Sequence, residues 1–77
     1  MIVGDRLYMF TIYERPTDYP AEFVCRRSYS HPGGVVTDAE LYARGPTLES
    51  VRAQIPDGQI CMARHPTDAL AIVEVWF

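Results

Sequence analysis

The chain contains two cysteines and two histidines, and together they would suit a metal site. Cys25, His31, Cys61 and His65 offer two thiolates and two imidazoles, a ligand set that zinc binds in tetrahedral sites. Each cysteine lies in an expected strand and each histidine in the turn after it, so the four side chains could meet at one end of neighbouring strands. The spacings lack the Cys-x-x-Cys knuckle common in structural zinc sites. A small zinc-binding domain is therefore an alternative hypothesis, beside burial of the cysteines as small apolar side chains.

Nucleophilic catalysis would need a nucleophile, a base and an orienting group in one cleft. Ser28, Ser30 and both cysteines could serve as nucleophiles, with His31 or His65 as the base. The sequence has no glycine-rich phosphate loop, no G-x-S-x-G elbow and no H-E-x-x-H helix. A chain of 77 residues also has little room for the roughly 300–1,000 Å³ pocket of a small-molecule site. We therefore expect no catalytic residues, no cofactor and no enzymatic activity.

Arg26 and Arg27, followed by Tyr29, are a basic and aromatic combination of the kind found on sheets that stack nucleic-acid bases. The whole chain, however, has 7 basic and 10 acidic residues and a net charge of -3. Nucleic-acid-binding domains usually carry a basic excess gathered on one face. We therefore expect no nucleic-acid partner, and we expect the two arginines to be solvated on a strand near the sheet edge.

These residues must be positioned by a few strands and one helix. Aromatic and β-branched runs bounded by proline, glycine and aspartate predict strands at residues 6–13, 23–29, 59–64 and 70–77, and a broken strand at 35–37 and 40–44. Thr47 is suited to cap a helix whose apolar stripe is Leu48, Val51 and Ile55. The order ββ(β)αββ predicts a single α+β domain over residues 1–77. Its antiparallel sheet of four to five strands carries one short helix packed on one face.

The first and last expected strands are apolar on both faces, which is typical of a sheet that is covered on both sides. In the last strand Ala71, Val73, Val75 and Phe77 point one way, and Leu70, Ile72 and Trp76 point the other way with Glu74 among them. One short helix can cover only one face. The second face must be covered by the proline-rich loops of the same chain, by a second copy or by a different protein. Aromatic residues suited to protein contacts are Tyr13, Tyr19, Tyr42 and Trp76.

The surplus of apolar strand surface favours a non-catalytic protein-interaction module. One form of this hypothesis is a homodimer, and another is an accessory or phage-borne protein that modulates a host protein. The N-terminus has no signal-peptide pattern and no stretch is long and apolar enough to span a membrane. Two cysteines are also too few for the disulfide framework of a secreted mini-protein. We therefore expect a cytoplasmic protein without membrane contact.

Four segments carry a resemblance to other proteins: TIYERPTDYP at residues 11–20, ELYAR at 40–44, TLE at 47–49 and IVEVWF at 72–77. In these segments the chain resembles a set of small uncharacterised proteins of GC-rich bacteria and their phages. The resemblance covers most of the chain and implies a shared fold. It implies no activity, so the functional hypothesis depends on the sheet faces.

Overall fold

A computed structural model describes residues 1–66 and 70–77, and two long antiparallel strands form its centre. Strand β2 (Arg6–Glu14) pairs with β3 (Phe23–His31) in an unbroken register from Leu7 opposite Ser30 to Glu14 opposite Phe23. Both strands are rich in aromatic and β-branched residues, which fit a pleated and half-buried surface. The loop with Pro16 and Pro20 joins them. The first two expected strands are therefore confirmed, each slightly longer than its pattern suggested.

Shorter strands pair along the outer edges of this central pair. Strands β1 (Ile2–Val3) and β7 (Ile72–Trp76) pair with β2, while β4 (Gly34–Thr37) and β5 (Ala43–Gly45) pair with β3. Strand β6 (Cys61–Ala63) adds to the outer side of β7. The sheet order is β4-β3-β2-β7-β6, with β1 and β5 beside β2 and β3.

The described part of the chain thus has seven strands in one antiparallel sheet and one short helix, and the protein is mostly β. The expectation of four to five strands was too low. The sheet path is five strands wide, but the outer edge of β3 is shared by β4 and β5, and that of β2 by β1 and β7. Strand β1 has only two residues, too few to give an alternating pattern in the sequence. The expected turn at residues 65–68 lies partly outside the described residues.

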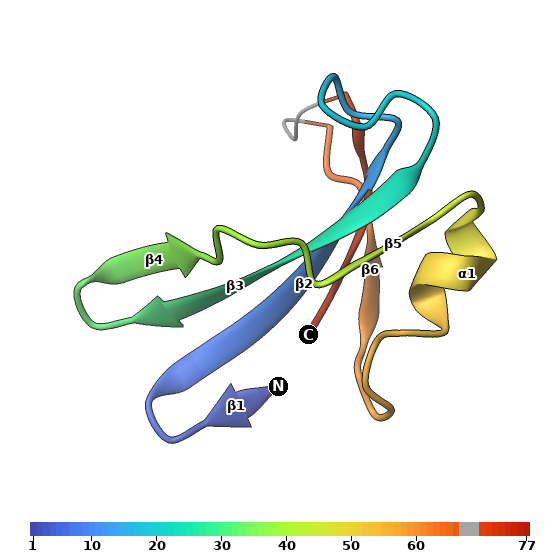
Figure 1. The fold of residues 1–77 in the computed structure, drawn as a ribbon. Coiled ribbons are helices and arrows are strands. Elements are labelled where there is room, and N and C mark those ends of the chain that lie inside the picture. The colour runs from blue at the N-terminus through green and yellow to red at the C-terminus, as the bar shows by residue number, and fades with distance from the viewer. Residues whose placement is uncertain (67–69) are drawn as a thin grey trace.

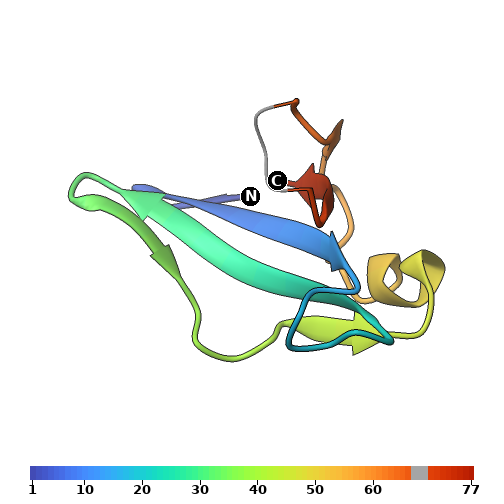
Figure 2. The same ribbon diagram turned by 90° about the horizontal axis from the view of Figure 1, so that it is seen from above.

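The helix α1 (Leu48–Arg52) begins where Thr47 caps it. The Thr47 hydroxyl accepts a hydrogen bond from the Ser50 amide at 3.2 Å, and the Ser50 hydroxyl accepts one from the Thr47 amide at 3.3 Å. This reciprocal capping satisfies amides that the first helical turn leaves open. Figure 1 shows α1 at one end of the sheet, opposite the end that carries β1 and β4, and Figure 2 shows the same separation from above.

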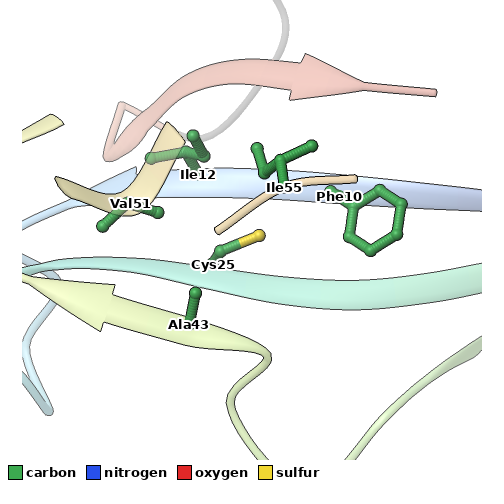
Figure 3. Close-up of a cluster of buried hydrophobic side chains, with 6 residues drawn as sticks. All are labelled: Phe10, Ile12, Cys25, Ala43, Val51 and Ile55. Carbon is green, nitrogen blue, oxygen red and sulfur yellow. The ribbon is translucent and has the colours of Figure 1, made fainter. Parts of the chain in front are cut away.

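The main core lies between α1 and the sheet. Its buried side chains come from β2, β3, β5, α1 and the turn after α1, and they are Phe10, Ile12, Cys25, Ala43, Val51 and Ile55 (Figure 3). Partly buried Tyr8, Phe23, Leu48 and Trp76 pack around them. The helix therefore packs on one face of the sheet, as the sequence predicts. Cys25 behaves here as a small apolar side chain, fully buried in this cluster.

A bulge between β2 and β7 changes the faces expected for the last strand. Glu74 lies opposite Ile12, but the next pair is Ile72 opposite Tyr13, so Val73 is an extra residue. Glu74 therefore shares the helix side of the sheet with Ile12, whereas Ile72 is on the other side with Tyr13. The expectation that Ile72 and Glu74 share one face was wrong because strict alternation stops at Val73.

Candidate functional site

Four hydrogen-bond donors from three residues converge on the carboxylate of Glu74. Arg52 donates to it twice, from Nε to Oε1 at 2.7 Å and from Nη2 to Oε2 at 2.8 Å. The indole Nε1 of Trp76 donates to Oε1 at 3.0 Å, and the thiol of Cys61 donates to Oε2 at 3.4 Å. Glu74 is 5 % exposed, so these contacts satisfy a buried charge.

The electrostatics of this cluster oppose catalysis by its members. The two Arg52 hydrogen bonds, against the cost of burial, hold the pKa of Glu74 at about 2. A carboxylate of such low basicity is a weak general base near neutral pH. Burial, together with the hydrogen bond to Glu74, raises the pKa of the Cys61 thiol, which reduces the thiolate needed for nucleophilic attack. The arrangement is suited to joining α1 to β7 and not to moving protons.

The four expected metal ligands lie in different surroundings, and His65 lines a hollow together with Met62 and Val75. Cys25 is buried in the core near the start of β3, and His31 ends the same strand six residues later, a span of about 20 Å in an extended strand. Cys61 lies on β6, which β7 and β2 separate from β3. Among residues 1–66 and 70–77, no three or more His, Cys, Asp or Glu side chains are grouped to hold a metal ion.

Arg26 and Arg27 lie on opposite faces of β3, and each faces a carboxylate. Arg26 pairs with Asp18 at 3.0 Å, and Arg27 pairs with Asp38 at 2.7 Å. Arg27 also lies 5.4 Å from the centre of the Tyr8 ring, and Tyr8 packs on Tyr29 with ring centres 5.4 Å apart. These cations and rings therefore contact other groups within the chain, and each arginine has an acidic partner.

The four aromatic contact candidates do not form one surface. Tyr42 packs edge-on against Phe10 with ring centres 4.8 Å apart, and Trp76 packs on the same core. Tyr19 lies under the guanidinium of Arg44, 5.8 Å from it. Tyr13 is half-buried on the opposite side of the sheet. The structure therefore places Tyr42 and Trp76 at the rim of the core and leaves Tyr13 alone on the second face.

A polar hollow of about 570 Å³ lies beside β5, lined by Tyr19, Arg26, Tyr42, Arg44 and other residues. Its two arginines already face carboxylates, because Arg26 pairs with Asp18 and Arg44 lies 3.9 Å from Glu22. An anionic ligand would have to compete with both carboxylates. The charges of this hollow are therefore already paired within the chain.

The second face of the sheet is apolar and only partly covered. The strand registers place Ile2 opposite Leu7, Thr11 opposite Val75, and Val75 opposite Met62, so these side chains share this side of the sheet. We call it the open sheet face and define it by Ile2, Leu7, Met9, Ile60, Met62, Val75 and Phe77. Ile60 belongs to it because it exchanges two backbone hydrogen bonds with Phe77. Leu7, Met9, Val75 and Phe77 are half-buried, while Ile2, Ile60 and Met62 are exposed.

The proline-rich loop covers the other half of this side. Val24, which lies opposite Tyr13, is fully buried, and Tyr13, Pro16 and Ala71 line one hollow with it. No helix or strand covers the open sheet face within the described residues, and a hollow of about 300 Å³ is lined there by Leu7, Met9, Val75, Phe77 and their neighbours. The chain's own proline-rich loop, one of the three expected ways to cover the second face, therefore covers one part of that face and leaves the open sheet face uncovered within the described residues.

Alternation within each strand was enough to group Leu7 with Met9 and, separately, Val75 with Phe77. Sequence reasoning did not find Ile2, Ile60 or Met62, because their place depends on which strands are neighbours. The signal for them was weak: short apolar pairs in Met1–Val3 and in Ile60–Ala63, each next to a turn residue.

Comparisons of this chain with protein-family models, with curated proteins and with solved structures found no match. Within the described residues, no helix has the length and apolar character needed to cross a membrane.

Proposed function

We propose that this protein is a non-catalytic protein-interaction module that docks through the open sheet face. The observation that carries the proposal is the character of that face. None of the described strand residues on this side of β1, β2, β6 and β7 is charged, because Arg6, Glu14 and Glu74 alternate onto the other side. Contiguous apolar surface of this kind is typical of sites that bind other macromolecules.

Burial of this surface would stabilise a small domain. Ile2, Ile60 and Met62 are 75, 62 and 52 % exposed, so each leaves more than half of its side chain in water. Full burial of a large apolar side chain contributes about 1.5–3 kcal/mol relative to full exposure. A chain of 77 residues has a small core, so contacts of this size matter to its folding as well as to its binding.

The chemistry of the remaining side chains agrees with a binding role. The basicity of Glu74 is low, and burial raises the pKa of the Cys25 thiol to about 12, so neither group is poised for proton transfer or attack. Both cysteines are free thiols, which agrees with the cytoplasmic location that we infer for the protein. An accessory role toward a host protein remains one form of the proposal.

Site-specific photo-crosslinking tests this function. A photoreactive phenylalanine analogue at Met62 lies on the open sheet face, and the same analogue at Glu49 lies on α1, where the side chain is 80 % exposed. We expect a covalent adduct with a polypeptide from position 62 and none from position 49. Equal labelling at both positions, or none at either, would contradict a docking role for this face.

A further inference from the structure

We draw no further inference here: the strongest candidate, the open sheet face around the hollow that Leu7, Met9, Val75 and Phe77 line, is an apolar surface for which nothing in the described part of the chain shows what covers it.

Discussion

Arg52 of α1 and Glu74 of β7 form a bidentate ion pair, with nitrogen–oxygen distances of 2.7 and 2.8 Å. The pair joins residues that are 22 positions apart in the sequence and links the helix directly to the sheet. Two parallel hydrogen bonds fix the orientation of both groups as well as their distance. The short helix, which has five residues and could not persist alone, is thus held by a directional contact in addition to its buried Val51.

Glu74→Gln should lower the free energy of unfolding by on the order of 2 kcal/mol at pH 7, because it removes the charge that Arg52, Trp76 and Cys61 all donate to. Urea denaturation of the two proteins measures the difference. Glu49→Gln is the matched control, since Glu49 also contacts Arg52, at 3.0 Å, but its side chain is 80 % exposed. The control should change stability by less than about 0.5 kcal/mol. Similar losses in both variants would show that the buried pair contributes no more to the free energy of unfolding than the exposed pair does.

The stability contributed by this pair should depend on pH in a defined range. The pKa of Glu74 is about 2 in the folded chain, against an ordinary value of 4.5. A depressed carboxyl pKa gives stability that is complete above about 4.5 and is lost as the pH falls towards about 2. The difference in unfolding free energy between wild type and Glu74→Gln should therefore be constant from pH 5 to 7 and shrink below it. A difference that stays constant down to pH 2 would contradict the depressed pKa.

The sequence predicted the parts of the fold that depend on local pattern. Aromatic and β-branched runs identified β2 and β3, and Thr47 identified the start of α1. The end of α1 was less predictable. Its apolar stripe runs to Ile55, but the amides of Gln54 and Ile55 bond to carbonyls three residues back, so the last turn is tighter than an α-helix. Ile55 still reaches the core, which is why the stripe and the assigned helix differ.

Features that depend on strand order or on a bulge could not be predicted from the local sequence pattern. The pairing of Glu74 with Arg52 requires β7 to lie beside β2 and α1 to pack where Arg52 can reach this carboxylate. The open sheet face likewise requires β1 and β6 to lie beside β2 and β7, which one sequence does not reveal. The surplus of apolar strand surface was visible in the sequence, but its location was not.

Gly45→Ala should destabilise the protein by about 2 kcal/mol, because β5 passes very close to the start of α1. A methyl group on Gly45 would collide with the hydroxyl of Ser50 and lie 3.0 Å from its Cβ. Ser50 cannot turn away without breaking its capping contacts with Thr47. Thermal or urea denaturation measures the loss.

Gly33→Ala is the control for that substitution. A methyl group there would meet only the imidazole of His31, with its nearest atom at 2.8 Å, and that ring can move away at the cost of one exposed hydrogen bond from the Gly33 amide to Nδ1. Its effect should be less than about 1 kcal/mol. Equal effects at Gly33 and Gly45 would mean that the close approach of β5 to α1 does not constrain the fold.

The two thiols should react in a fixed order with an alkylating reagent. Cys61 is exposed and Cys25 is fully buried, with its pKa raised to about 12 by burial, so only Cys61 should be labelled in the folded protein. Cys25 should be labelled only as the protein unfolds, and mass spectrometry of the labelled peptides distinguishes the two. Early labelling of Cys25 would contradict its place in the core.

Glu74 should also control the reactivity of Cys61. Burial, followed by the hydrogen bond to Glu74 and its negative charge, raises the pKa of the Cys61 thiol, while Arg52 lowers it. In Glu74→Gln the charge is gone and Arg52 remains, so more thiolate should form and labelling at pH 8 should be faster than in the wild type by several-fold. Glu49→Gln, which leaves Glu74 in place, should label at the wild-type rate. Slower labelling of Cys61 in Glu74→Gln would mean that the thiol does not contact this carboxylate in solution.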